Sequence, residues 1–185
     1  SYSGNTSTIS DQTLGIAQKY NVDGNRRLTN FFPDANSPLD IALARQDSNN
    51  PLAPTSIKDR NNYQTLITYD ANGNVLTMTD ALNNTTKFEY DSMNNVNKKT
   101  DPLNRVTTYT YDATGNLTKI TAPIGTVNIT NNLYGHPERV TDANSNTTTY
   151  AYDSYGNLTE IREPLSRTTK FGYDTVGRKT SETDA

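Results

Sequence analysis

A motif of about 21 residues recurs along the latter two-thirds of this 185-residue chain, and it constrains the fold more than any other feature of the sequence. Five copies carry a Tyr-Asp pair, and successive pairs stand 21, 21, 41 and 21 residues apart. The interval of 41 divides into 20 and 21 around a degenerate copy at Asn131-Asn132. The five pairs are Tyr69-Asp70, Tyr90-Asp91, Tyr111-Asp112, Tyr152-Asp153 and Tyr173-Asp174. Such regularity indicates an array of structural repeats.

Each copy is predicted to contain two tight turns. The first turn follows the Tyr-Asp pair, and its fourth residue after the Tyr is Gly or Asn, which tolerate a positive φ. An Asp that opens such a turn accepts a backbone N–H from two residues on, so we expect a type I turn followed by a left-handed residue. The left-handed positions are Gly73, Asn94, Gly115, Gly135, Gly156 and Gly177. The second turns, half a repeat away, run Asp80…Asn83, Asp101…Asn104, Asp142…Ser145 and Glu163…Ser166.

Between the turns, apolar and polar residues alternate with period two, which is typical of half-buried antiparallel strands. In one strand Phe88 and Tyr90 share a face, while Lys87 and Glu89 point the other way. The 30 Thr and 24 Asn favour strands and turns. We predict an all-β fold, a long antiparallel meander of about 12–14 short strands in a twisted, spiralling sheet. The face predicted to be buried carries Phe88, Tyr90, Tyr109, Tyr111, Tyr150, Tyr152, Phe171 and Tyr173.

Residues 1–60 depart from the period. Residues 1–32 are interpreted as N-terminal strands and a decayed first repeat at Tyr20–Asn25, with Leu28–Phe32 as its returning strand. Residues 33–60 hold half of the Pro residues and are predicted to form an insertion or capping loop. A short helix is expected to open there at Ser37-Pro38. Residues 61–185 then hold six repeats of about 21 residues, with 12 strands from Gln64 onward.

Composition excludes several classes of function. The chain has no Cys, so disulfides, thiolate nucleophiles and Cys-ligated zinc are ruled out. A net charge of −3 and a pI of about 5.1 provide no basic surface for nucleic acid. No apolar run approaches the ~18 residues of a membrane-spanning helix. Neither a signal peptide nor an initiator Met is present, so we expect Ser1 to be a cut end.

No catalytic, cofactor or metal site is predicted. His136 is the only His and stands where the turn motif has Asn, so we interpret it as a turn variant. Asp70–Asn74 and Asp142–Asn146 resemble the start of a calcium loop but lack its Gly and its final Glu. The carboxylates belong to the Asp column of the repeats or are scattered, so no acid–base pair stands out. The Tyr column would bind sugars if it were exposed, but a buried cross-strand ladder is the favoured interpretation.

The pattern Tyr-Asp-x-x-Gly-Asn-Leu, followed half a period later by Thr-Asp, resembles the YD (RHS) repeat family. The best copies are Tyr111–Leu117 and Tyr152–Leu158, and the resemblance covers residues 61–185. It implies a spiralling β-sheet which, in long arrays, closes into a hollow shell around a toxic cargo or forms scaffolds in cell-surface adhesion proteins. The family's Asp-Pro-x-Gly-Leu motif, where such arrays are plugged and cleaved, has no match here, and six or seven units are too few to close a large shell.

We therefore predict a structural role, as a scaffold or shell-wall segment of a secreted or cell-surface protein, without catalysis. Two alternatives stay open, namely an adhesion or carbohydrate-binding module and a self-assembling subunit of a tube or filament. The expected partners are further repeats or neighbouring copies, joined through edge strands such as Arg178–Glu182, with glycans as a further candidate. No cofactor, nucleic acid or membrane span is expected. The residues expected to matter are the Tyr, Asp and Gly positions of the repeats.

Overall fold

The computed structural model describes residues 6–11, 16–22, 28–32, 41–59 and 61–184, and these residues form an antiparallel β structure. They contain seventeen strands and one 3-10 turn, η1 (Pro164–Ser166). The first eight strands are β1 (Thr6–Asp11), β2 (Ile16–Val22), β3 (Leu28–Phe32), β4 (Ile41–Ala44), β5 (Ser56–Lys58), β6 (Gln64–Tyr69), β7 (Val75–Thr79) and β8 (Thr85–Tyr90). The others are β9 (Val96–Thr100), β10 (Val106–Tyr111), β11 (Leu117–Ala122), β12 (Gly125–Asn131), β13 (Pro137–Thr141), β14 (Thr147–Tyr152), β15 (Leu158–Arg162), β16 (Thr168–Tyr173) and β17 (Lys179–Thr183).

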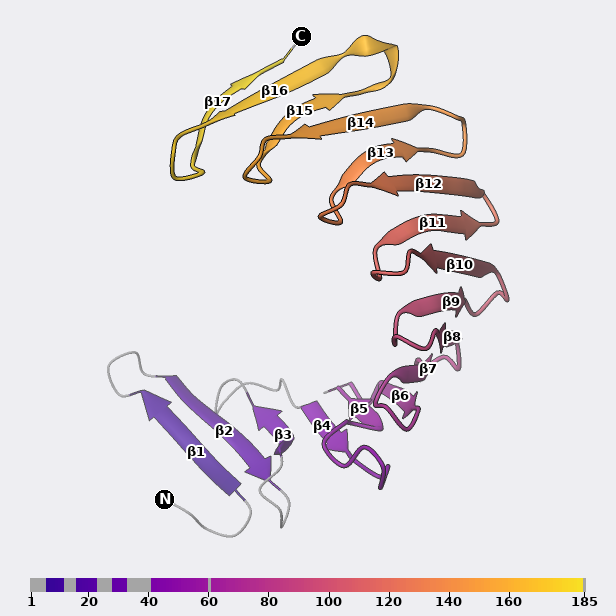
Figure 1. Ribbon diagram of the computed structural model, residues 1–185. Helices are drawn as coiled ribbons and strands as arrows, with labels where there is room; N and C mark the ends of the chain where they lie inside the picture. Colours follow the sequence, from indigo (N-terminus) through magenta and orange to yellow (C-terminus); the bar gives the residue numbers. More distant parts are fainter. Residues whose placement is uncertain (1–5, 12–15, 23–27, 33–40, 60, 185) are drawn as a thin grey trace. The chain divides into compact units, whose positions relative to one another are not determined.

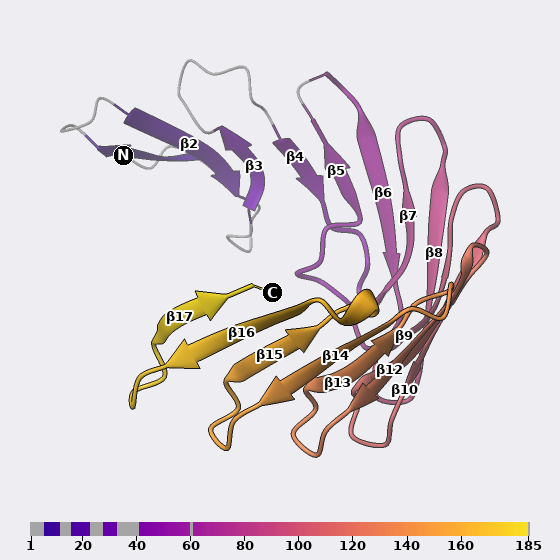
Figure 2. The ribbon, with the colours of Figure 1, turned by 90° about the horizontal axis from the view of Figure 1, so that it is seen from above.

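The strands belong to two compact units, and the chain meanders through each of them. One unit is Ser1–Glu89 with Thr100–Leu103, and the other is Tyr90–Lys99 with Asn104–Ala185. Within each unit, every strand pairs antiparallel with the next strand in sequence, as Figures 1 and 2 show for β10 to β17. The predicted all-β meander is confirmed, as are the twelve strands from Gln64 onward. The total exceeds the expected 12–14 because residues 1–60 contribute five strands.

The first turns have the predicted geometry. At Asp112–Asn116, the Gly115 N–H donates to the Asp112 carbonyl oxygen at 3.1 Å, and the Asp112 N–H donates to the Asn116 carbonyl oxygen at 2.9 Å. Gly115 has φ +87° and Gly156 has φ +86°. The strand register shifts by one residue just before Tyr111. Each first turn is therefore a type I turn that ends in a left-handed residue and a β-bulge.

The second turns are more varied. Asn83, Asn104 and Ser145 all have a positive φ, as predicted. Ala122 pairs directly with Gly125, so only Pro123 and Ile124 form that turn, and the shorter loop accounts for the single 20-residue interval. A methyl group on Gly125 would lie 2.3 Å from the Cβ atom of Ala143 in the next second turn, which leaves no room for a side chain. At η1, Leu165 and Ser166 both have a positive φ.

The two faces of the sheet differ as expected, although burial is shallower than predicted. The eight rings assigned to the inner face are all half-buried, whereas Lys87 and Glu89 on the opposite face are exposed. Ile67, at 7% exposure, is the one buried apolar residue among those described, and none of them is fully enclosed. A ring on a single sheet is covered mainly by its neighbours along that sheet, and part of its surface therefore stays in contact with water.

The described strands within residues 1–60, β1 to β5, continue the antiparallel meander. Strands β2 and β3 form a hairpin, and the predicted return strand Leu28–Phe32 is confirmed. Its register shift lies between Asn21 and Val22, so Val22 rather than Tyr20 occupies the position of the repeat Tyr. The expected helix is wrong for Ile41–Ala44, which is strand β4 and pairs with β5, while residues 37–40 lie outside the described residues. The division of the chain at residues 32 and 60 stays a prediction.

Candidate functional site

The most regular chemical feature is a set of hydrogen bonds around the Asp that opens each turn. In Asp153–Asn157, Oδ1 of Asp153 accepts the N–H groups of Tyr155 and Asn157, both at 2.9 Å. Its Oδ2 accepts the side-chain amide of Asn157 at 2.9 Å. We call this arrangement the Asp–Asn clasp. Clasps occur at Asp70–Asn74, Asp80–Asn84, Asp91–Asn95, Asp112–Asn116, Asp142–Asn146 and Asp153–Asn157.

The clasp stabilises the ionised carboxylate. The side-chain amide of Asn157, followed by the backbone N–H groups of the turn, lowers the pKa of Asp153. At Asp112 the Thr114 hydroxyl adds a further bond of 2.7 Å, and with Asn116 it lowers the pKa of Asp112 to about 2. These carboxylates use both oxygens inside their own turns. Calcium-loop chemistry at Asp70 or Asp142 would have to displace those bonds.

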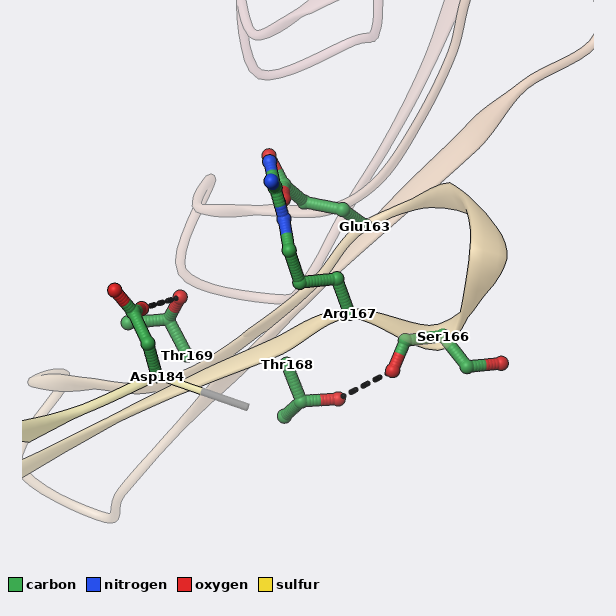
Figure 3. Close-up of polar contacts among 6 residues, drawn as sticks. All are labelled: Glu163, Ser166, Arg167, Thr168, Thr169 and Asp184. Carbon is green, nitrogen blue, oxygen red and sulfur yellow. Dashed lines mark hydrogen bonds and ion pairs between the residues drawn. The ribbon is translucent and has the colours of Figure 1, made fainter.

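Two turns near the C-terminus replace the amide donor of the clasp with Arg. Arg178 Nε donates to Asp174 Oδ2 at 2.7 Å, and Arg167 pairs with Glu163 (Figure 3). The Thr169 hydroxyl donates to Asp184 at 2.6 Å, and that of Thr168 donates to the Ser166 carbonyl oxygen. Figure 3 draws both contacts. Both Arg side chains are mostly in water, so these ion pairs contribute little to stability. Their geometry nevertheless matches the clasp, with one donor four residues after the carboxylate.

The repeat Tyr bonds each hairpin to the preceding one. Tyr152 donates its hydroxyl to the Pro137 carbonyl oxygen at 3.0 Å, and Tyr111 donates to that of Val96 at 2.9 Å. Tyr173 and Tyr69 make the same contact with Leu158 and Pro54. In all four cases the acceptor lies 15 residues earlier. For Tyr111, Tyr152 and Tyr173 it is the residue that follows the preceding first turn, and for Tyr69 it lies in the loop between β4 and β5. We call this contact the Tyr tie, and it buries the ring edge while satisfying its polar end.

The degenerate copy keeps these contacts with different residues. Asn131 stands in place of the Tyr, and its side-chain amide donates to the Leu117 carbonyl oxygen at 3.0 Å. Asn132 replaces the Asp, and its Oδ1 accepts the N–H groups of Tyr134 and His136 at 2.9 and 3.0 Å. The Asn132 Nδ2 atom takes the place of the Asp Oδ2 atom and cannot accept the side-chain amide that closes a clasp. His136 stands at the position of that amide instead, with its ring centroid 5.0 Å from that of Tyr152.

At three first turns the Gly also allows a close approach to the preceding turn or its counterpart. A Cβ atom on Gly135 would lie 2.5 Å from Oδ1 of Asn116, and one on Gly156 would lie 3.3 Å from Cε1 of His136. A Cβ atom on Gly73 would lie 3.2 Å from Oδ1 of Asn50. At these positions Gly therefore serves two purposes, a positive φ and a close approach to the preceding turn.

The irregular loop between β4 and β5 imitates a first turn, which the sequence analysis missed. Asn50 donates its side-chain amide to Asp47 Oδ2 at 2.9 Å and to the Asp70 carbonyl oxygen at 2.8 Å. Pro54 supplies the acceptor for Tyr69. Pro54 lies 15 residues before Tyr69, the same interval as in the regular ties, and this spacing is recognisable only once the ties are known.

The acidic side chains of the described residues are mostly spread along the turns. No cluster of three or more His, Asp or Glu side chains able to hold a metal ion occurs among them. His136 stacks on Tyr152, and no second His exists in the sequence. In the same part of the chain, no helix is both long and apolar enough to cross a membrane. What the site residues do is hold turns and connect hairpins.

The fold is similar to a small part of several longer chains of known structure. A crystal structure of TcdB2-TccC3 without its hypervariable C-terminal region matches 97% of this chain and 11% of its own, with TM-score 0.72 and 16% identity. TcdB2-TccC3-Cdc42 matches 97% of this chain and 13% of its own, with TM-score 0.61 and 16% identity. A Photorhabdus luminescens Tc holotoxin pore matches 95% and 13%, with TM-score 0.60 and 14% identity. The likeness establishes the fold, over a small part of each longer chain.

The sequence itself identifies the family. No curated protein matches the chain. The RHS Repeat family model, in contrast, matches residues 69–103, 98–127, 132–168 and 152–185, which together make up more than half of the chain. These segments contain the clasps and ties of the unit that holds β10 to β17. The chain therefore belongs to the RHS-repeat family.

Proposed function

We propose that this structural repeat scaffold is a wall segment of a secreted or cell-surface protein and carries out no catalysis. The observation that supports this role is the Tyr tie with its Asn131 substitute, because each connects one hairpin to the one before it. The Asp carboxylates of the regular turns are likewise bonded to the turn backbone. The fold is similar to that of TcdB2-TccC3 and of a Tc holotoxin pore, and the likeness to a toxin assembly favours an extracellular location.

The wall role is tested by removing the ties. Replacing Tyr111, Tyr152 and Tyr173 together with Phe deletes three hydroxyl bonds and keeps the rings. We expect the variant to be cleaved much faster than the parent chain in limited proteolysis at neutral pH, because hairpins open independently in a loosened repeat array. The same replacement at the exposed Tyr134 and Tyr155 is the control. Equal protease resistance of the triple variant and the parent would contradict the role.

The second part of the proposal concerns partners at the strand edges. Strand β17 pairs with β16, and all five of its residues are exposed. Lys179 and Glu182 form an ion pair of 2.7 Å on it, which does not block its backbone groups. We propose that a further repeat or a neighbouring copy occupies this edge. Amide hydrogen exchange at 179–183 should be slow in the native assembly and fast in the isolated chain, and equally fast exchange in both would exclude such a partner.

Electron microscopy separates the wall role from the filament alternative. Monodisperse particles of the purified chain agree with a wall segment, whereas extended filaments would make self-assembly the better description. The Tyr-column form of the carbohydrate alternative is weakened, because the hydroxyls of Tyr69, Tyr111, Tyr152 and Tyr173 are engaged by the backbone.

A further inference from the structure

Asn72 differs from every other Asn of the chain in the residue that follows it. It is the only one of the 24 Asn residues that precedes a Gly. The pair Asn72-Gly73 lies in the first turn between β6 and β7, and both residues are exposed. The backbone nitrogen that follows an Asn can attack the side-chain carbonyl carbon, and a Cβ atom on the attacking residue hinders the approach. Gly has no Cβ atom, so Asn72 is the Asn of this chain most open to such attack.

The turn holds the attacking nitrogen loosely. The N–H group of Gly73 donates to the Asp70 carbonyl oxygen at 3.2 Å, whereas the equivalent bonds of Gly115 and Gly135 measure 3.1 and 3.0 Å. The neighbouring Asn74 is held more firmly, since Asp70 accepts its N–H group at 2.8 Å and its side-chain amide at 2.9 Å. Attack on Asn72 therefore requires the opening of an exposed bond that is the longest of its kind among the described first turns.

We propose that Asn72 is a site of spontaneous deamidation. The Gly73 nitrogen forms a bond to Cγ of Asn72, the bond from Cγ to the side-chain nitrogen breaks, and the proton of the Gly73 nitrogen leaves with that nitrogen as ammonia. The product is a cyclic succinimide. Water then adds to one of its two carbonyl carbons and opens the ring, which produces either Asp or isoaspartate at this position. The reaction consumes water alone and involves no oxidation or reduction.

Isoaspartate would alter a turn that fits closely against its neighbour. The main chain then runs through the former side chain, which adds one methylene group between residues 72 and 73. Asn50 donates its side-chain amide to the Asp70 carbonyl oxygen at 2.8 Å, and a Cβ atom on Gly73 would lie 3.2 Å from Oδ1 of Asn50. A turn lengthened by one atom cannot keep both the Asp70–Asn74 clasp and this approach. The reaction also adds a negative charge to a turn that already contains Asp70.

The consequence is a weak point that develops with the age of the protein. It lies where the irregular loop between β4 and β5 meets the first regular hairpin. Deamidation detaches that hairpin from Asn50, and it acts on one hairpin because the other first turns have Met, Thr, Tyr or Val in place of Asn72. The wall role does not depend on this reaction, so either proposal can fail without the other.

Other Asn residues are protected by the residue that follows or by the clasp. Asn144 is exposed and precedes Ser145, which has φ +66°, but the Ser side chain hinders attack. The side-chain amides of Asn116 and Asn157 are bonded to Asp112 and Asp153, and Leu follows each of them. These positions are the internal references for the rate at Asn72.

Peptide mass spectrometry of the full chain tests the reaction. The folded chain and the same chain in urea are incubated at mildly alkaline pH, and digestion at low pH with electron-transfer fragmentation separates Asn, Asp and isoaspartate. Asn72 should convert at least tenfold faster than Asn144. Its rate in the folded chain should lie within about tenfold of that in urea, because one exposed turn bond restrains the nitrogen. A folded chain that stays intact at Asn72, or an equal rate at Asn144, would overturn the proposal.

A pair of exchanged residues tests whether the turn and the Asn-Gly pair together define the site. Asn72→Thr gives this turn the residue of the Thr114 position and should abolish the reaction. Thr114→Asn places Asn before Gly115 in an equivalent turn and should create a second site with a rate within about threefold of that at Asn72. No conversion in the second variant would show that the pair in this type of turn is not sufficient.

Hydrogen exchange tests the weak point. In the aged chain, the amides of Asn50 and Asn74 should exchange at least tenfold faster than in fresh protein, while the amide of Asn116 in the reference turn stays unchanged. Asn72→Asp adds the charge without the methylene group and should accelerate exchange less than threefold. Unchanged exchange at Asn74 in the isoaspartate form would overturn the weak point, and equal acceleration by Asn72→Asp would assign the effect to the charge instead.

Discussion

The turns Asn132–His136 and Asp153–Asn157 are successive copies of one structure built from different side chains. In both, an Oδ1 atom accepts two backbone N–H groups, and in both the strand before the turn donates a side-chain bond back to the preceding hairpin. Yet the first has no carboxylate, no Tyr hydroxyl and no clasp donor. The hairpin therefore requires an acceptor and a donor in given places rather than a Tyr-Asp pair.

Low pH should produce the largest difference between the two turns, because it protonates the carboxylates of all the Asp turns together. The hydrogen bonds from Asn157 and the turn backbone lower the pKa of Asp153 from its usual 3.8. The stability that the ionised carboxylate provides is therefore complete above the pKa of the unfolded chain and is lost as the pH falls through the pKa of the folded state. For the equivalent carboxylate of Asp112, the folded-state pKa is about 2. Asn132 does not titrate. NMR signals of the Tyr155 and Asn157 amides should change in this range.

The amide of Tyr134 in the variant turn should stay close to its neutral-pH position over the same range. If the signals of both turns moved together, the clasp carboxylate would not be what stabilises the regular turn. Glu138 is exposed and has no part in either turn's hydrogen bonds among those described, so it does not complicate the comparison.

Gly135→Ala should destabilise more than Gly156→Ala. Both residues have a positive φ, which costs about 1 kcal/mol for a residue with a side chain. Only Gly135 faces an atom at 2.5 Å, and Asn116 is held there by Asp112 and Thr114. We expect about 2 kcal/mol for Gly135→Ala and about 1 kcal/mol for Gly156→Ala, measured as local opening free energies by hydrogen exchange. Equal costs would mean that Asn116 moves aside freely.

Tyr152→Phe and Asn131→Ala should each cost about 1 kcal/mol, because each removes one hydrogen bond to a carbonyl of the preceding hairpin. Tyr155→Phe is the control, since its ring is almost fully exposed. Denaturant midpoints of the three variants provide the measurement. A cost for Tyr152→Phe no larger than that of the control would show that the ring, not the hydroxyl, makes the tie.

The smallest expected effect comes from making the two turns alike. Asn132→Asp with His136→Asn restores a clasp, which should raise the free energy of unfolding by about 0.5 kcal/mol because the turn is exposed. Thermal unfolding of the double variant and of each single change would show this. A loss of stability in the double variant would mean that His136 contributes more by packing on Tyr152 than the clasp provides.

The repeat period, the strands and the turn geometry were predictable because each depends on local chemistry. A positive φ at Gly115 follows from the turn that Asp112 opens, and the face of Phe88 and Tyr90 follows from alternation. The ties were not predicted, since they join residues 15 apart in a sequence that gives no sign of which carbonyl lies nearby. The substitute at Asn131 was recognised only as a gap in the pattern.

Residues 41–58 were misjudged for a related reason. Proline and the loss of period suggested a loop, but strands β4 and β5 are only four and three residues long and are positioned by pairing with β3 and β6. Pairing across a sheet overrides local preference in strands this short.

The Tyr ties also imply an order in which the hairpins of the array fold during synthesis. Every donor described comes later in the chain than its acceptor, so a hairpin attaches to one that has already been made. At about 5–20 residues per second a ribosome adds one repeat in roughly one to four seconds, while a hairpin forms in about 1–10 μs. Each repeat thus has ample time to close on a finished neighbour before the next emerges. The sheet can therefore form during synthesis, and at its growing end only the most recently synthesised strand lacks a paired neighbour.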